Sequence, residues 1–330
     1  MMKSAPLFFL WVLIIFYINA CTPPAIPESP NAPESPVVSN LPFEDFSTRI
    51  MIVPDIQNYS YSEDRLKYLD AITEYYCNNK DCIELVLQVG DLTYHNVVWQ
   101  YENVWNHFFS SFNRDDQLVF CLGNHDYGNR GSSDIRESNI PDYMMPSLDL
   151  RMESSLWENY VRYVTIGKVT YGVMVLEFCT RNETLEWANH VLETDSQTPY
   201  IILLHVFLDQ NGEMFDTLNP NVINKGSSHK DYQMGDEYKN DSREIFDKII
   251  YNNKNVKMVV CGHCLTPSYI NVHTEKNIVG ENVRMIEVNY QHYGNGGEGH
   301  VGLLDIFNGT YRIRSYSTYY DEYAGIDIIF

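Results

Sequence analysis

The sequence predicts an α/β fold in which two β-sheets pack face to face and helices cover their outer faces. Strand-like runs alternate with helix-like segments through most of the chain, and the C-terminal part is rich in strands. In addition, polar residues directly follow five of the strand-like runs. Side chains at the carboxyl ends of strands in one open α/β sheet meet at a ligand-binding crevice, so we expect these residues to lie together.

The position of each element follows from the spacing of its apolar residues. Strands are expected at Arg49–Pro54, Ile83–Val89, Leu118–Leu122, Tyr200–Leu204 and Val256–Cys261. Helical spacing predicts helices over Ser62–Asn78, Val97–Phe112, Glu183–Thr194 and Ser242–Tyr251. Two hairpins are expected, one from Tyr160–Thr165 with Thr170–Phe178, the other from Val301–Phe307 with Tyr311–Ser317 around Asn308-Gly309.

The N-terminal residues have the features of a lipoprotein signal peptide. Lys3 supplies a positive charge, and the apolar stretch Leu7–Ile18 is too short for a comfortable transmembrane span. Ile18-Asn19-Ala20-Cys21 resembles a bacterial lipobox, which would make Cys21 the lipidated first residue of the mature protein. Residues 1–20 are therefore predicted to be a signal peptide. An uncleaved membrane anchor and ordinary secretion are the alternatives.

A proline-rich linker is predicted over residues 21–45, and a single domain over residues 46–330. The linker contains Pro23, Pro24, Pro27 and Pro30, a composition typical of a semi-rigid spacer. It would hold the domain away from a membrane surface. Residue 22 is Thr and not Asp, so the sequence has no inner-membrane retention signal. We expect a lipid-anchored protein of the cell envelope, at the outer membrane of a Gram-negative bacterium, or a secreted one.

The charge of the chain excludes one class of partner. The formal net charge is −21, with only 23 Lys and Arg, and no basic stripe is present. Binding to a nucleic-acid backbone requires clustered positive charge. No nucleic-acid partner is therefore expected.

The cysteines after Cys21 favour a role in core packing over a role in thiol catalysis. Cys121 and Cys179 lie in apolar strands and are predicted to be core residues. Cys77 and Cys82 lie close together, and an oxidising compartment would permit a bridge between them. Cys261-Gly262-His263-Cys264 matches the motif of protein disulfide isomerases, but Pro267 follows where a helix would be needed to lower a thiol pKa. Thiol redox catalysis is a minor alternative.

The five polar segments carry residue types that bind metal ions. They are Asp55-Ile56-Gln57, Gly90-Asp91, Gly123-Asn124-His125-Asp126, His205 and Gly262-His263. Asp, Asn, Gln and His offer oxygen and imidazole nitrogen, which suit Zn, Mn or Fe. Their recurrence after successive strands predicts a metal centre.

These segments resemble the calcineurin-like metallophosphoesterases, whose motifs run Asp-x-His, Gly-Asp, Gly-Asn-His-Asp/Glu, a lone His, and Gly-His-x-His. Asp55-Ile56-Gln57-Asn58-Tyr59-Ser60 is most similar to a secreted branch that has Asp-x-Gln in the first motif. Leu185–Asn189 and Asn289-Tyr290-Gln291 also resemble that branch, and the similarity extends from about Ile50 to Tyr320. The resemblance implies a four-layer αββα sandwich of two mixed β-sheets.

The same resemblance implies a role for each polar residue. Asp91 would bridge two divalent metal ions, with Asn124, His205 and His263 completing one site and Asp55 and Gln57 contributing to the other. His125 would be the general acid or phosphate stabiliser, oriented by Asp126. Two metal ions can hold the attacking and leaving oxygens of a phosphoester and lower the pKa of water.

The chain departs from the family pattern on one side of the expected centre. Gln57 and Leu265 stand where the family has His, so the Asp55/Gln57 metal site is expected to be weak. Another residue could replace the missing His as a metal ligand. Tyr94 is one candidate because Gly90–Tyr94 resembles the Gly-Asp-x-x-Tyr of purple acid phosphatases, and His95, Cys264 and His292 are others.

The sequence thus predicts a lipid-anchored, metal-dependent phosphoesterase that hydrolyses a phosphomonoester or phosphodiester by direct water attack. His95 and Arg181 are predicted to contact the phosphorylated substrate, and His229 is a weaker candidate. The alternative is a surface-binding lipoprotein that kept the fold and lost catalysis. Gln57 and Leu265 favour that alternative, whereas the pair His125-Asp126 favours the enzyme.

Overall fold

The computed structural model describes residues 48–112, 118–145, 150–151, 157–235, 237–307 and 309–330. The chain divides into the units Met1–Glu44 and Asp45–Phe330. The predicted signal peptide, the lipidation residue Cys21 and the proline-rich linker lie outside the described residues. Within the residues that are described, no helix is both long and apolar enough to cross a membrane.

The first sheet contains six strands in the order β13-β12-β11-β1-β2-β3. Their bounds are β1 Arg49–Val53, β2 Ile83–Gln88, β3 Leu118–Phe120, β11 His300–Phe307, β12 Thr310–Ser317 and β13 Glu322–Ile329. Strands β1, β2 and β3 are parallel, whereas β11 runs antiparallel to β1. The sheet is therefore mixed, and its three parallel strands end at the same edge.

The second sheet contains seven strands in the order β4-β5-β6-β7-β8-β10-β9. Their bounds are β4 Leu150–Arg151, β5 Tyr160–Ile166, β6 Val169–Val175, β7 Tyr200–Leu203, β8 Val256–Cys261, β9 Ile270–Lys276 and β10 Asn282–Val288. Strands β6, β7, β8 and β10 are parallel. The sheet is again mixed, with an antiparallel strand at each end.

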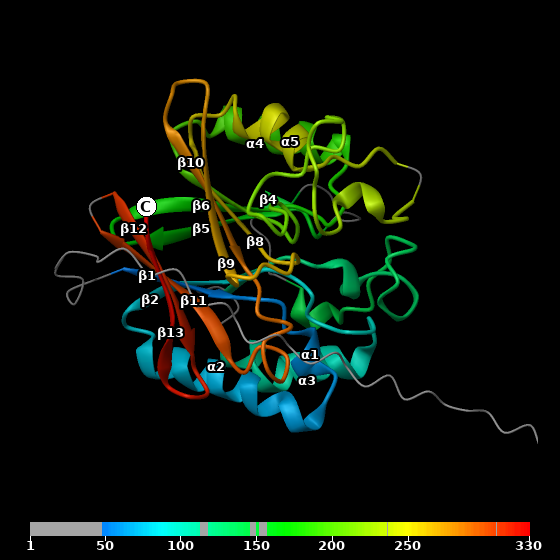
Figure 1. The fold of residues 1–330 in the computed structure, drawn as a ribbon, viewed down its shortest axis with the longest axis vertical. Coiled ribbons are helices and arrows are strands. Elements are labelled where there is room, and N and C mark those ends of the chain that lie inside the picture. The colour runs from blue at the N-terminus through cyan, green and yellow to red at the C-terminus, as the bar shows by residue number, and fades with distance from the viewer. Residues whose placement is uncertain (1–47, 113–117, 146–149, 152–156, 236, 308) are drawn as a thin grey trace, which may run out of the picture. The chain divides into compact units, whose positions relative to one another are not determined.

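Helices cover the outer face of each sheet (Figure 1). The helices are α1 Gln57–Ser60, α2 Leu66–Asn79, α3 Val98–His107, α4 Asn182–Thr194 and α5 Ser242–Ile245, which continues as the π-helical turn η8 Phe246–Ile250. Short 3-10 turns lie at Glu63–Arg65, Phe109–Ser111, Asn124–Asp126, Asn129–Gly131, Asp142–Met144 and His229–Asp231. A capping box starts α5, because Asp241 Oδ1 accepts from Glu244 N (3.1 Å) and Glu244 Oε2 accepts from Asp241 N (3.0 Å).

Three buried apolar layers hold these elements together. Leu69 and Ile72 of α2 pack with Met51 and Val86 of the first sheet. The inner faces of the two sheets meet through residues such as Ile52, Leu87, Val173, Leu203 and Val260. Leu185 and Ala188 of α4 pack with Met174 and Ile202 on the outer face of the second sheet. The order helix, sheet, sheet, helix confirms the predicted four-layer αββα sandwich.

The predicted elements are confirmed, with small shifts at their ends. The helix expected from Ser62 begins at Leu66 after a 3-10 turn, and the strand expected to reach Phe178 ends at Val175. The hairpin of β9 and β10 and the last strand, β13, were not predicted from the sequence. Strand β9 is an edge strand with the sequence INVHTEK, so its mostly polar side chains give little apolar signal.

Cys121 and Cys179 are buried, as expected of core residues. Cys77 and Cys82 are exposed free thiols.

A buried ion pair ties the centre of the first sheet together. The Asp305 carboxylate on β11 is fully buried and accepts from Arg49 Nε of β1 (2.6 Å) and Arg314 Nη2 of β12 (2.7 Å).

We expect Asp305→Ala to lower the free energy of unfolding by roughly 3–5 kcal/mol, because two arginines lose a buried partner. Urea unfolding measures this. Glu281→Ala, which breaks an exposed pair with Lys257, should leave the midpoint unchanged, and equal effects of the two variants would contradict the assignment.

Candidate metal centre

The five polar segments lie where they were predicted, directly after strands of both sheets. Asp55 follows β1, Asp91 follows β2 and Asn124 follows β3, while His205 follows β7 and His263 follows β8. Each of these strands has a parallel neighbour among them, so their carboxyl ends lie at a common edge. The two sheets thus contribute to one centre.

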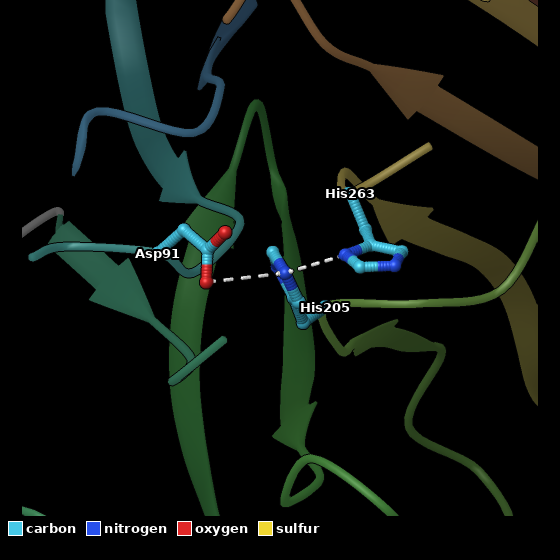
Figure 2. A group of neighbouring side chains, drawn as sticks. All are labelled: Asp91, His205 and His263. Atoms are coloured by element: carbon cyan, nitrogen blue, oxygen red, sulfur yellow. Dashed lines mark hydrogen bonds and ion pairs between the residues drawn. The ribbon is translucent and has the colours of Figure 1, made fainter. Parts of the chain in front are cut away.

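Three of these side chains form a compact cluster (Figure 2). Ligand atoms of Asp91, His205 and His263 all lie within 4.8 Å of one another. The Nε2 atom of His205 is central, at 3.4 Å from Asp91 Oδ1 and 3.2 Å from His263 Nδ1. Asn124 Oδ1 is 3.1 Å from the same nitrogen. The predicted ligand set of Asp91, Asn124, His205 and His263 is therefore brought together.

One nitrogen of each imidazole faces the cluster. His205 Nδ1 donates to the carbonyl of Val89 at 2.7 Å, so Nε2 is the nitrogen that faces the cluster and would bind a metal ion in its deprotonated form. Nε2 of His263 lies 3.2 Å from the hydroxyl of Tyr232, so Nδ1 is the nitrogen that faces the cluster. Carboxylate oxygen, amide oxygen and two imidazole nitrogens thus converge as electron-pair donors. This donor set fits a divalent metal ion of the Mn, Fe or Zn type.

Electrostatics at the cluster also favour positive charge. Burial alone would lower the pKa of His205, but the carboxylates of Asp91 and Asp55 outweigh it and raise that pKa to about 9. Burial and the neighbouring Asp91 raise the pKa of Asp55 to about 7. Burial and the proximity of His205 lower the pKa of His263 to about 3. The two buried carboxylates therefore favour a positive charge beside them, which a proton on His205 or a bound metal ion would supply.

Backbone geometry shows why the motifs contain glycine. A Cβ atom at Gly123 would collide with the Asp91 carboxylate, and one at Gly262 would collide with the carboxylate of Asp55. Asp91 and His263 adopt left-handed backbone conformations, with φ of 53° and 71°. Such conformations are costly for residues other than glycine and concentrate at functional sites. Local backbone strain at Asp91 and His263 thus directs both side chains toward the same cluster.

The other half of the centre is occupied by an amide network. The Gln57 Nε2 group donates to Asp91 Oδ2 (3.1 Å) and to Gln291 Oε1 (2.7 Å). The Nε2 group of Gln291 donates in turn to Asp55 Oδ2 (3.3 Å) and to the carbonyl of His263 (3.1 Å). Asn289 Nδ2 also donates to Asp55 Oδ2, at 3.3 Å. Neutral hydrogen-bond donors therefore satisfy the two carboxylates that a second metal ion would need.

This network gives the expected weakness of the Asp55/Gln57 site a physical cause. A metal ion there must displace the amide donors, whereas the Oε1 atom of Gln57 is buried without a partner and would be available as a ligand. Gln291 and Asn289 were not predicted as site residues. Two signals were available: Asn289-Tyr290-Gln291 is part of the family resemblance, and it lies directly after β10, a strand that was not predicted.

Asp126 contacts backbone groups and not the ring of His125. Its carboxylate accepts from the backbone N–H groups of Leu92 (3.0 Å), Thr93 (2.9 Å) and Gly123 (3.0 Å), so it joins the loops after β2 and β3. The ring of His125 is held instead by the carbonyl of Tyr94, which lies 3.0 Å from Nδ1. Among the described contacts, Asp126 does not bond to the His125 ring, so any effect of Asp126 on that ring would pass through the loops it joins.

The centre opens into a cleft of about 240 Å³. Its lining includes Asp91, Asn124, His125, His263 and Gln291, together with Gln210, Gly226, Ser227, Tyr232, Cys264, Leu265 and His292. Tyr232 was missed by the sequence analysis, since nothing in the polar segment around it indicated contact with His263. Of the suggested replacement ligands, Cys264 and His292 reach this cleft.

Arg181 lies away from the cleft lining, and its position gives the predicted contact with substrate no support. Its guanidinium is nearly buried and donates to the Glu177 carboxylate at 2.9 Å (Nε) and 2.7 Å (Nη2). Arg136 Nη1 approaches the same carboxylate at 3.3 Å. Arg181 is absent from the residues that line the cleft. Its role is to balance a buried carboxylate.

The other two substrate candidates are also displaced from the cleft lining. His229 is buried, with Nδ1 at 3.0 Å from the carbonyl of Asn240, and burial lowers its pKa to about 4. His95 lies beside the centre, where its ring meets the rings of Tyr94 and Tyr61 at 4.8 and 5.3 Å. The Tyr94 ring lies 5.1 Å from that of His125.

Cys261 and Cys264 do not form a redox site. Cys261 ends β8, Cys264 lies in the following loop, and both are buried free thiols. Burial raises the pKa of each thiol, whereas a reactive cysteine needs a lowered one.

Metal content should separate the two halves of the centre. After dialysis, the wild-type chain is expected to retain about one ion tightly, and His263→Ala to lose it, because one of four ligands is removed. Gln57→Ala should retain that ion. The double variant Gln57→His with Leu265→His should approach about two ions, since it restores imidazole ligands. Elemental analysis decides this, and loss of all metal from Gln57→Ala alone would reverse the ranking of the halves.

Arg181→Ala should change stability and not substrate affinity. The Glu177 carboxylate would lose its closest charged partner, so we expect the melting temperature to fall by several degrees. The KM for a phosphoester should stay the same. A raised KM with an unchanged melting temperature would restore the substrate-binding role.

Comparison with known proteins agrees with this geometry. The calcineurin-like phosphoesterase family model matches residues 48–267. A search of curated proteins found no match. Among solved structures, the chain is similar to a purple acid phosphatase from yellow lupin (Lupinus luteus) seeds, with 14% identity and a TM-score of 0.49. The match covers 86% of this chain and 53% of the lupin chain, so the chain spans about half the length of that relative.

The chain is also similar to a second solved structure, GAP50 of Plasmodium, described as the anchor in the inner membrane complex. It is 10% identical with a TM-score of 0.47, over 85% of this chain and 87% of that one. The family match covers both metal-ligand halves and the His125 loop. The chain therefore belongs to the calcineurin-like phosphoesterases, a family of metal-dependent phosphoric ester hydrolases.

Proposed function

We propose that the protein hydrolyses a phosphomonoester or phosphodiester by direct attack of water at the cleft beside Asp91. The observation that carries the proposal is the convergence of four donor side chains, Asp91, Asn124, His205 and His263, next to His125 in one cleft. A divalent cation bound there would supply Lewis acidity toward the phosphoryl oxygens and the attacking water.

The protein's own residues supply position and protons. His125 Nδ1 donates to the carbonyl of Tyr94, so the ring orientation is fixed and Nε2 is the nitrogen available to the substrate. We assign His125 the role of proton donor to the leaving oxygen. Its backbone N–H donates to Asp91 Oδ1 at 2.9 Å, which couples the acid to a metal ligand. Tyr232 orients His263 through Nε2.

The proposal includes two divalent ions, Mn, Fe or Zn, of which the one at Asp55 and Gln57 is the weaker. The amide network around Asp55 supports this inequality. It also supports the alternative of a binding protein with weakened catalysis, because a half-empty centre would be slow. The positioned ring of His125 favours the enzyme, since a purely structural metal site has no use for it.

The predicted location is also part of the proposal. A lipid anchor at Cys21 and the proline-rich residues up to 45 would hold the hydrolase at the outer membrane, where its substrate would be a phosphorylated small molecule or macromolecule. The formal net charge of −21 argues against a nucleic-acid substrate.

Turnover of an aryl phosphate tests the function. We expect hydrolysis that requires added Mn²⁺ or Zn²⁺ and stops with a chelator. His125→Ala should lower kcat by about 10²–10⁴-fold, the range expected for loss of a general acid. His190→Ala, on the exposed face of α4, is the control and should be fully active. Full activity of His125→Ala would refute the mechanism, and no turnover with any divalent metal would favour the binding protein.

A further inference from the structure

A patch of exposed aromatic rings borders the metal centre. It consists of Tyr61, Tyr94, His95 and Trp99, and we call it the aromatic patch. The side chains of Tyr61, Tyr94 and Trp99 are 48%, 37% and 47% exposed. Their rings form a continuous group, because Tyr61 lies 5.2 Å from Tyr94, 5.3 Å from His95 and 6.4 Å from Trp99. Single exposed aromatic residues are common, but a contiguous group marks an interaction site.

The residues of the aromatic patch belong to the same helix and loop as residues of the metal centre. Tyr61 caps the helix α1 that begins with Gln57, and Tyr94 follows Asp91 in one loop. The ring of Tyr94 lies 5.1 Å from the ring of His125. The patch is therefore the surface next to the proposed proton donor.

The aromatic patch is held in place by buried hydrogen bonds. Gln100 is fully buried, and its Oε1 accepts from the backbone N–H groups of both Tyr94 (3.0 Å) and His95 (2.8 Å). Asn103 Nδ2 donates to the carbonyl of Ser60 at 3.0 Å and so fixes the end of α1 against α3. Since the backbone under the rings is anchored, a ligand would bind them without first ordering a loop.

The chemistry of the aromatic patch selects one kind of occupant. Tyrosine and tryptophan rings spaced about 5–6 Å apart suit a planar aromatic group, which can stack on them or meet their edges. The net charge of −21 opposes a long polyanion, so the aromatic group must belong to a small molecule. The proton from His125 goes to the leaving oxygen, and the group attached to that oxygen then lies on the Tyr94 side.

We propose that the aromatic patch binds the planar aromatic part of the leaving group of a small phosphoester, a nucleobase or an aryl ring. The proposal rests on the function proposed above. An aryl ring attached directly to the phosphate would contact Tyr94. A nucleobase, which a sugar separates from the phosphate, would reach Tyr61 and Trp99.

Three phosphoesters and two variants test the proposal. The wild type should have a lower KM for adenosine monophosphate and phenyl phosphate than for ethyl phosphate. Trp99→Ala should raise the KM for adenosine monophosphate about tenfold, the size expected for one stacked ring, with kcat within about twofold. The KM for ethyl phosphate should not change. A KM increase confined to phenyl phosphate in Tyr94→Ala would identify an aryl group as the ligand.

The control is Tyr320→Ala, whose ring is 52% exposed outside the aromatic patch; it should change none of the constants. Equal KM changes for ethyl phosphate and the aromatic esters, or an unchanged KM for both aromatic esters in Trp99→Ala and in Tyr94→Ala, would overturn the proposal. If the wild type hydrolyses none of the esters, the proposed function fails, and calorimetric titration decides the inference. Weaker binding of adenosine monophosphate to Trp99→Ala than to wild type would support it, and equal or absent binding would reject it.

Discussion

The structure depends on the burial of two carboxylates, Asp55 and Asp91, beside two imidazoles at the shared edge of the sheets. Neither carboxylate has a lysine or arginine partner among its described contacts. Charges placed in a protein interior without compensation are costly, so the site favours a cation. The glycines at positions 123 and 262 and the left-handed backbone at Asp91 serve this arrangement, because they let loops from separate strands close around it.

The two halves of the proposed centre contain different groups, and the proposed inequality follows from their chemistry. On one side, imidazole and amide lone pairs face Asp91 and can only be satisfied by a cation or a proton. On the other side, Gln57 and Gln291 already donate to the carboxylates. A neutral amide donor offsets less of the carboxylate charge than a metal ion does. It is, however, always present, whereas a metal ion must be taken up from solution. The chain would then depend more on His125 and on substrate contacts than a centre with two equal metals.

Much of the fold and the ligand set could be predicted because the signals are local. A strand followed at once by Asp, Asn or His places that residue at a strand end, and apolar spacing identifies the helices. The remaining features depend on contacts between distant segments. Asp126 accepts hydrogen bonds from backbone groups of the loop after β2, and Arg181 donates to Glu177. Gln291 donates to Asp55, which lies 236 residues away in the sequence. Nothing in the residues themselves indicates these partners.

The most direct test of this account is the position of the metal ion, measured by anomalous diffraction from crystals grown with Mn²⁺ or Zn²⁺. We expect the strongest peak within coordination distance of the Asp91 carboxylate, Asn124 Oδ1, His205 Nε2 and His263 Nδ1, with a weaker peak or none beside Asp55 and Gln57. A strongest peak beside Asp55, or no peak at the His205 and His263 nitrogens, would contradict it.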